Sequence, residues 1–400
     1  MKNIFLSQQS SFDKLYPLVV HLPGFIRKQI ACYTSWYLRH RLRKKGLPEL
    51  LTLFVTDRCN LQCSHCFIST GDREKGWEMG TSEYEIFFSK AHGIFSKISF
   101  TGGEPTIRKD LGDIIAIASR SGGINSGNLM TNGVLRDNLI GAVERAFAES
   151  SISLSFQISI DGANSHHDTR RGVKGALGKT LETMNALREL KCKYPNRVNR
   201  LLVNTSISKQ NLHDLPAIID AVRATKFLHI FNFVRSSRIH TFNVSDAQVV
   251  SDYVPVNFND YLSVREMEEA LRIIYECVWC HDSEKMTYAT NCVALTTIID
   301  IMKTEMPLHR CFSGLGDIVL LPNGDVARCE MLKSFINLKE FNWNIAQMLN
   351  SSKSRSYYKN TNRCWCTHDC SLALSIMYDK NLLNKLLAGC DAVTDSSNRK

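Results

Sequence analysis

From about residue 50 onward, short apolar runs alternate with longer segments in which apolar residues recur every three or four positions. The short runs predict strands near 51–56, 97–101, 127–131, 153–160, 200–206 and 227–233. The longer segments predict helices near 82–95, 110–121, 136–148, 175–190 and 212–224. Strands separated by helices favour parallel βαβ units with right-handed crossovers. The pattern therefore predicts an α/β sheet, either open and doubly wound or part of a barrel, and periodicity alone does not choose between them.

The alternation stops near residue 235. Residues 236–262 are polar and mixed, which is typical of a linker, and helices are predicted near 264–280 and 289–303. From Cys311 the sequence pattern changes. It predicts short strands on either side of a Pro322–Asp325 turn, followed by a helix near 371–388. We expect five parts: an N-terminal arm (1–49), a core (50–235), a linker and helical segment (236–305), a cysteine-rich domain (306–392) and a tail (393–400).

Composition narrows the class of protein without identifying it. The chain has 400 residues, of which 44% are hydrophobic and 22% charged, as in ordinary globular proteins. The apolar runs are too short to cross a bilayer, and the first residues lack the apolar core of a secretory signal. We therefore expect a cytoplasmic protein, with membrane association left open by the arm described next.

Positive charge is concentrated at the N-terminus. The net charge is +10, and residues 1–50 hold nine Lys and Arg against two acids, so 9 − 2 = +7 of it lies there. Residues 24–45 also interleave aromatic residues with these cations. Three readings stay open: a helix lying on an anionic membrane, a helix docking an acidic partner, or a helix packed on the outside of the core. A nucleic-acid-binding protein would spread its basic residues over the face that contacts the nucleic acid. We therefore do not expect nucleic acid as a partner.

Three of the fourteen cysteines follow the first predicted strand directly, in the order Cys59, Cys63 and Cys66. The C-terminal end of a strand is where functional groups collect in α/β folds. Three thiolates on one short loop suit a [4Fe–4S] cluster with one iron left open to another ligand. A zinc site and plain buried cysteines are the alternatives.

This segment, C-x3-C-x2-C, resembles the signature of the radical S-adenosylmethionine (SAM) superfamily, with His65 at the position usually held by an aromatic residue that packs on adenine. The resemblance implies a partial (β/α)6 barrel, TIM-like, with the cluster at its open end. It also implies that SAM binds the open iron and is cleaved reductively to a 5′-deoxyadenosyl radical, which abstracts a hydrogen atom from a substrate.

Polar or glycine-rich elements follow the next three strands and agree with this resemblance. Paired glycines at 102 and 103 permit a close backbone approach, and the family's G-G-E-P element holds the methionine amino group. Residues 131–133 and 159–162 resemble its T-N-G and S-I-D-G elements, and 167–172 resembles H-D-x-x-R-G, with Arg171 as the partner of the SAM carboxylate and Arg170 as the fallback. The SAM-binding residues that these elements imply are His65, Gly102, Gly103, Glu104, Asn132, Ser159, Asp161 and Arg171.

Five further cysteines lie within sixty residues near the C-terminus: Cys311, Cys329, Cys364, Cys366 and Cys370. Together with Gly324 they resemble the SPASM and twitch domains that carry auxiliary clusters. The resemblance implies a second [4Fe–4S] cluster on Cys311, Cys329, Cys366 and Cys370, with Cys364 as the rival of Cys366, and a zinc ribbon is the alternative. A further cluster at Cys277 and Cys280 is conceivable, although helix packing explains them better.

The resemblance implies a radical SAM enzyme that oxidises, cross-links or epimerises a peptide or a small molecule, served by an electron donor such as flavodoxin or ferredoxin. No motif identifies the catalytic residues that face the substrate, because SAM carries the radical chemistry. The rival from another class is a zinc-bound, cysteine-rich nucleic-acid-binding protein without radical chemistry.

Overall fold

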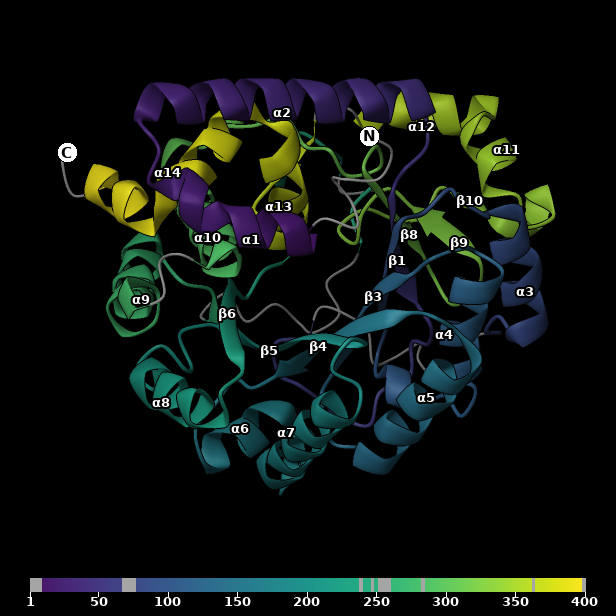
Figure 1. Ribbon diagram of the computed structural model, residues 1–400, viewed down its shortest axis with the longest axis horizontal. Coiled ribbons are helices and arrows are strands. Elements are labelled where there is room, and N and C mark those ends of the chain that lie inside the picture. The colour runs from purple at the N-terminus through teal and green to yellow at the C-terminus, as the bar shows by residue number, and fades with distance from the viewer. Residues whose placement is uncertain are drawn as a thin grey trace.

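The computed structural model describes residues 9–66, 77–236, 240–245, 248–250, 260–281, 285–361 and 364–397. One curved sheet organises the whole molecule (Figure 1). Its six parallel strands follow in chain order: β1 (Leu50–Phe54), β2 (Lys97–Thr101), β3 (Ser126–Thr131), β4 (Ser153–Ser159), β5 (Val198–Ile207) and β6 (Leu228–Phe233). The sheet stays open, with β6 at one edge, so the partial (β/α)6 barrel is confirmed.

Helices cover the outer side of this sheet, as crossover connections require. They are α3 (Thr81–Lys90), α4 (Leu111–Arg120), α5 (Arg136–Glu149), α6 (Ser165–Arg171), α7 (Ala176–Lys193) and α8 (Leu215–Thr225), which surround the lower half of the molecule in Figure 1. Apolar side chains such as Phe100, Leu129 and Phe156 alternate along the strands and are fully buried against these helices. The strand and helix positions predicted for residues 50–235 agree with these elements to within a few residues.

The C-terminal hairpin extends the same sheet. Strand β8 (Asp317–Leu320) pairs in parallel with β1, and β9 (Asp325–Ala327) and β10 (Ile336–Asn337) continue in antiparallel order. The predicted turn at Pro322–Asp325 does connect β8 to β9. The segment expected to be a linker contributes β7 (Thr241–Phe242), which pairs with β11 (Trp365–Cys366). The domain boundaries expected from the sequence stay a prediction. Strand pairs cross two of them, because β8 pairs with β1 and β7 pairs with β11.

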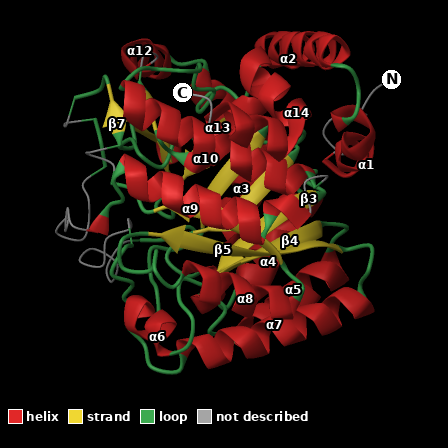
Figure 2. Cartoon of the chain, turned by 90° about the vertical axis from the view of Figure 1, so that its left-hand side faces the viewer, coloured by secondary structure: helices red, strands yellow, loops and turns green. Residues whose placement is uncertain are grey.

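The remaining helices follow β6 in the chain, and several of them face α5, α7 and α8 across the sheet (Figure 2). They are α9 (Val264–Cys277), α10 (Met286–Thr304), α11 (Ile345–Leu349), α12 (Ser352–Thr361), α13 (Asp369–Tyr378) and α14 (Lys380–Ser397). One helix was expected near 371–388, whereas two meet at Asp379, whose backbone is extended. Cys280 lies beyond the end of α9 in a short 3-10 turn, so Cys277 and Cys280 do not share one helix.

The N-terminal arm folds as α1 (Gln9–Val20) and α2 (Gly24–Lys45). Helix α2 packs on α13 and α14 rather than on the outside of the barrel, because Leu38 and Leu42 join a cluster with Phe312 and Tyr378. The Tyr16 hydroxyl on α1 donates to the carbonyl of Leu386 at 2.9 Å, which attaches α1 to α14. Within the described residues, no helix combines the length and apolar character needed to cross a membrane.

Candidate functional site

A cavity of about 410 Å³ opens at the C-terminal ends of the parallel strands. The predicted cluster and SAM residues that line it are Cys59, Cys63, His65, Cys66, Gly102, Gly103, Glu104, Asn132, Ser159 and Arg171. They come from the ends of four different strands and from α6, so the topology gathers residues that are 112 positions apart in the chain (171 − 59). The opposite wall is built by α10 and by the C-terminal segment, including Glu330, Asp369 and Cys370.

The cysteine loop after β1 is held by the end of α6. The backbone N–H groups of Gln62 and Ser64 donate to the carbonyl oxygens of Arg171 and Arg170, at 3.1 and 3.0 Å. Gly172 then turns away in the left-handed conformation, with φ of 71°. The H-D-x-x-R-G segment therefore positions the cysteine loop through its own backbone.

The paired glycines lie against the same loop. The N–H of Gly103 donates to the carbonyl of Thr56 at 2.7 Å, and the N–H of Glu104 donates to that of Arg58 at 2.8 Å. A Cβ atom on Gly102 would overlap the Thr56 carbonyl oxygen, and one on Gly103 would overlap that of Arg58. Gly102 also has a φ of 144°, which side chains rarely adopt. The predicted close backbone approach of the glycine pair is therefore an approach to the cysteine loop of the same chain.

A Gly103→Ala variant is expected to lose about 1–3 kcal/mol of stability, because the new methyl group meets backbone atoms that cannot rotate away. The cysteine loop would be displaced, so iron bound by the purified protein should also fall. Urea unfolding and iron counting measure both effects. Gly141→Ala, in the middle of α5 with nothing within 4 Å of the new Cβ, is the matched control and should be neutral or stabilising. Equal losses in both variants would contradict this account of Gly103.

Glu104 is buried, and its carboxylate oxygens already accept hydrogen bonds from other residues of the chain. It accepts hydrogen bonds from the Thr106 hydroxyl at 2.6 Å, the Thr131 hydroxyl at 2.7 Å and the N–H of Asn132 at 2.7 Å. Burial raises the pKa of this carboxyl, although these donors oppose the shift. Glu104 therefore fastens the end of β2 to the end of β3 and fixes where Asn132 lies.

A buried charged cluster lies directly beneath the cysteine loop. Oδ2 of Asp161 is 2.5 Å from Nη2 of Arg171 and 3.2 Å from Nε2 of His65, and its Oδ1 accepts from the N–H of Ser206 at 2.8 Å. Despite burial, Arg171 and His65 hold the pKa of Asp161 well below its ordinary value. The Asp161 side chain is completely buried and does not line the cavity, so it acts on the site through Arg171 and His65.

The two candidate arginines have different surroundings. Nη1 of Arg171 lies 3.6 Å from Sγ of Cys63, and the side chain borders the cavity. Arg170 points away, donating to the hydroxyl of Ser208 at 2.9 Å and to Oε1 of Gln210 at 3.2 Å. Burial raises the pKa of the Cys63 thiol, and the nearby Arg171 guanidinium counteracts this shift by favouring the thiolate.

The geometry of the cysteine triplet suits an iron–sulfur cluster better than one zinc ion. Thiolates on a tetrahedral zinc lie about 3.8 Å apart, given Zn–S bonds of about 2.3 Å. In the described part of the chain, two groups have three ligand atoms within 4.8 Å of one another, and the triplet is not among them. A four-iron cube spreads its cysteine ligands further apart than a single ion does. The three thiols line one cavity without being gathered round a single point, which favours a cube over a single zinc ion.

Four of the five C-terminal cysteines form a second group of thiols. Burial raises the pKa of Cys329, and the thiols of Cys366, Cys311 and Cys364 raise it further. Cys366 likewise responds to Cys311 and Cys364, and Arg328 lies close enough to three of these thiols for its own pKa to be raised by them. Cys364 and Cys366 thus both lie with Cys311 and Cys329, whereas the sequence left them as rivals.

Cys370, the fifth of these cysteines, lies beside Glu330 and His368 instead. Its Sγ, an oxygen of Glu330 and a ring nitrogen of His368 are within 4.8 Å of one another, and Cys370 borders the main cavity. Nε2 of His368 is 3.2 Å from Oε2 of Glu330. Arg235, which follows β6, pairs with both Asp369 at 2.7 Å and Glu330 at 3.3 Å. This half-buried arginine attaches the C-terminal segment to the end of the barrel.

Asp317, at the start of β8, is a buried carboxyl whose pKa is raised to about 7, chiefly by burial. A carboxyl with a raised pKa stabilises the fold most below its unfolded value of about 3.9, and this contribution is lost as pH rises to about 7. An Asp317→Asn variant should therefore gain stability relative to the wild type as pH rises from about 4 to about 7, by up to about 1.4 kcal/mol per pH unit, with no further gain above that range. Urea unfolding across this range measures the gain. Asp220→Asn, which changes an exposed carboxylate, is the control, and an equal gain there would refute the role of burial.

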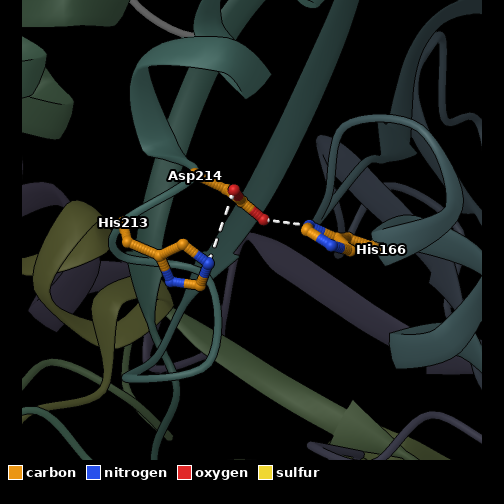
Figure 3. A group of neighbouring side chains, drawn as sticks. All are labelled: His166, His213 and Asp214. Atoms are coloured by element: carbon orange, nitrogen blue, oxygen red, sulfur yellow. Dashed lines mark hydrogen bonds and ion pairs between the residues drawn. The ribbon is translucent and has the colours of Figure 1, made fainter.

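Apart from Glu330, His368 and Cys370, another group of side chains of the kind that bind metals lies on the outer surface (Figure 3). The carboxylate of Asp214 lies between the imidazoles of His166 and His213, with Oδ1 at 3.4 Å from Nε2 of His213 and Oδ2 in contact with Nδ1 of His166. Asp214 occupies the N-cap of α8 without capping it through its side chain. Both imidazoles are more than half exposed, so we interpret the group as a tether between α6 and α8.

Several cavity residues were missed by the sequence reasoning. They are Arg200, Asn204, Asn232, Arg235, Asn291, Glu330 and Asp369. Asn204 and Asn232 lie near the ends of β5 and β6, where their Nδ2 and Oδ1 atoms are 3.4 Å apart. The rule that polar groups gather at strand ends would have found these two. No local signal marks the others, because they reach the cavity only through the packing of distant segments.

Comparisons with known proteins agree with this architecture. Residues 53–222 match the model of the radical SAM superfamily. The chain is 30% identical over 257 residues to Fe-coproporphyrin III synthase of Methanosarcina barkeri, covering 60% of this chain and 56% of that protein. It is 34% identical over 177 residues to PqqA peptide cyclase of Bradyrhizobium diazoefficiens, covering 44% and 43%. The chain thus spans about half the length of these curated relatives.

Solved structures share the fold at low sequence identity. Streptococcus suis SuiB, solved with S-adenosylmethionine, aligns with a TM-score of 0.55 and 12% identity, covering 78% of this chain and 68% of SuiB. The protein anSMEcpe, solved with AdoMet and a peptide, aligns with a TM-score of 0.54 and 13% identity, covering 88% and 99%. Residues 53–222, which hold the cysteine triplet and the strand-end elements, therefore form a radical SAM domain, and the cysteine-rich C-terminal region follows it.

Proposed function

We propose that this protein is a radical SAM enzyme that takes a hydrogen atom from an unactivated C–H bond of its substrate. The observation that carries the proposal is the shared cavity, in which the three thiols of Cys59, Cys63 and Cys66 face Asn132, Ser159 and Arg171. When a [4Fe–4S] cluster and SAM are bound there, they supply reductive cleavage of SAM and the radical that removes the hydrogen atom.

The chain's own residues hold and orient these groups. The three thiols provide the cluster ligands and leave the side toward the cavity open. We assign the SAM carboxylate to Arg171, whose guanidinium borders the cavity while Asp161 fixes its orientation. We assign the adenine contact to His65 and polar contacts to Asn132 and Ser159. The glycine pair and Glu104 serve as positioning residues, because their hydrogen bonds lock the cysteine loop and the end of β3.

We assign an auxiliary [4Fe–4S] cluster to Cys311, Cys329, Cys364 and Cys366, because these four thiols are electrostatic neighbours and Cys370 is not among them. In a background in which the first triplet is replaced by alanine, about four iron atoms per chain should remain. Adding Cys364→Ser should remove that iron, whereas adding Cys370→Ser should leave it. Iron and sulfide counting distinguishes the two variants. Retention of iron by the Cys364 variant together with loss by the Cys370 variant would restore the set with Cys370.

The substrate is proposed by class only. Relatives include a peptide cyclase and a porphyrin-modifying enzyme, so we propose a peptide or a small molecule that is oxidised, cross-linked or epimerised. The cavity offers it Asn232 at the end of β6, and Glu330 and Cys370 on the opposite wall. We place the reaction in the cytoplasm, where thiols stay reduced, with a low-potential donor of the flavodoxin or ferredoxin type.

Anaerobic purification of the wild-type chain tests the proposal directly. We expect brown protein with about eight iron atoms per chain, and release of 5′-deoxyadenosine when SAM and dithionite are added. Mutation of Arg171 to Lys should weaken SAM binding while the iron count is kept, since lysine cannot make the bidentate contact. Colourless protein with two zinc atoms, or iron-loaded protein that never cleaves SAM, would refute the proposal.

A further inference from the structure

Helix α2 presents three large aromatic side chains to the outside, whereas small side chains and two leucines face the protein. The buried positions are Ala31, Thr34, Ser35, Leu38 and Leu42. By contrast, Phe25 and Tyr33 are each 66% exposed and Trp36 is 55% exposed. A surface helix of a globular protein normally has the opposite arrangement, with polar residues outward. The outer side of α2 therefore has the character of a face that contacts another surface.

The exposed residues share one side of the helix. At 3.6 residues per turn, positions separated by three, four, seven or eight lie on the same face. The outer face consists of Phe25, Lys28, Gln29, Cys32, Tyr33, Trp36, His40, Arg43 and Lys44, all of which are exposed. The rings of Tyr33 and Trp36 lie 6.1 Å apart, and those of Trp36 and His40 lie 5.6 Å apart. These residues make a continuous aromatic ridge with cations toward both ends, which we call the α2 ridge.

Among the residues that the structure describes, none buries the α2 ridge, since every member of the ridge is exposed. The other side of α2 is already packed on α13 and α14, so the helix is anchored without any help from the ridge. Figure 2 shows α2 at the top margin of the molecule. Of the eleven large hydrophobic residues that are exposed in the described part of the chain, five lie on α1 and α2, including Leu15 and Leu18. The two helices of the N-terminal arm therefore carry nearly half of the large hydrophobic side chains that are exposed in the described part of the chain.

Charge indicates what the ridge contacts. The α2 ridge itself carries the exposed cations Lys28, Arg43 and Lys44 and no acidic residue, so its charge favours an anionic partner. Amphipathic rings of Trp and Tyr favour the headgroup region of a bilayer, and each Lys or Arg beside an anionic membrane adds attraction. Helix α2 lacks the length and apolar character needed to span a membrane, but an amphipathic helix can lie in the interface between bilayer and water. We propose that the α2 ridge docks the protein on an anionic lipid bilayer, with α2 lying parallel to the surface.

Vesicle flotation with the intact, iron-loaded protein tests this proposal. The probes are vesicles of phosphatidylcholine alone and vesicles with about 30% phosphatidylglycerol. We expect binding to the anionic vesicles that weakens as salt is raised, with a blue shift of tryptophan emission. Arg43→Gln/Lys44→Gln should weaken binding about 25-fold, since each cation near such a surface contributes about fivefold. Tyr33→Ser/Trp36→Ser should weaken it at least about tenfold, because two interfacial rings are lost.

Ile86→Ser/Leu181→Ser removes two exposed apolar side chains on α3 and α7 and is the matched control, which should bind like the wild type. Circular dichroism and the iron content of every variant confirm that the fold is unchanged. The proposal is overturned if the wild type ignores anionic vesicles, or if the ridge variants and the control bind equally well. It is also overturned if the ridge variants keep lipid binding and instead lose binding to an acidic protein such as flavodoxin.

Discussion

Replacing Cys59, Cys63 and Cys66 together with alanine is expected to abolish release of 5′-deoxyadenosine and to lower iron from about eight to about four atoms per chain. The physical reason is that the three thiols are the cysteines after β1 that face the cavity, and they lie apart from the C-terminal group. Removing them deletes one cluster and leaves the other. Iron and sulfide counting, and chromatography of the SAM products after dithionite, measure the two losses separately.

The matched control replaces Cys32 and Cys192, two exposed cysteines outside both groups. This variant should keep its iron and its cleavage of SAM. A triplet variant that loses all eight iron atoms would mean that the two sites are not independent. One that keeps all of its iron would mean that the thiols hold no cluster, and either result would require the site to be redrawn.

Much of this site could be predicted from the sequence because parallel strands all point the same way. Once the strands before Cys59, Gly102 and Asn132 are recognised by their apolar runs, the residues that follow each strand must meet at one end of the sheet. The glycine pair was expected for the same reason, since only glycine allows two backbones to touch there. Local pattern and strand direction together were sufficient for this half of the site.

The other half depends on contacts between segments far apart in the chain. Our proposal to leave Cys370 out of the auxiliary cluster rests on such a contact: Cys370 lies in the first turn of α13, close to Glu330 and His368 and at the border of the cavity. The pairing of β8 with β1 joins residues 267 positions apart (317 − 50), and no periodicity records it. The location of α2 was open for the same reason, because its two faces are both partly apolar and periodicity could not tell which one packs.

An Asp161→Asn variant is expected to lose about 3–5 kcal/mol of stability at pH 7, because it leaves the buried guanidinium of Arg171 without its counter-charge. The amide can still accept the hydrogen bond from the N–H of Ser206, so the loss reports charge rather than shape. Urea unfolding of the iron-loaded protein, without oxygen, measures it. Asp137→Asn, whose carboxylate is 85% exposed beside Arg136, is the matched control and should change stability by less than about 1 kcal/mol.

The dependence on pH separates this explanation from simple misfolding. The pKa of Asp161 is held well below its ordinary value, so its stabilising charge is complete above about pH 4 and is lost only as pH falls through the lower folded-state pKa. The gap between wild type and variant should therefore be constant from pH 5 to pH 8 and shrink in stronger acid. Adding Arg171→Met to the variant should restore part of the stability, because no unpaired buried charge remains. A double variant no more stable than Asp161→Asn alone would show that Asp161 stabilises the fold by some means other than its pairing with Arg171.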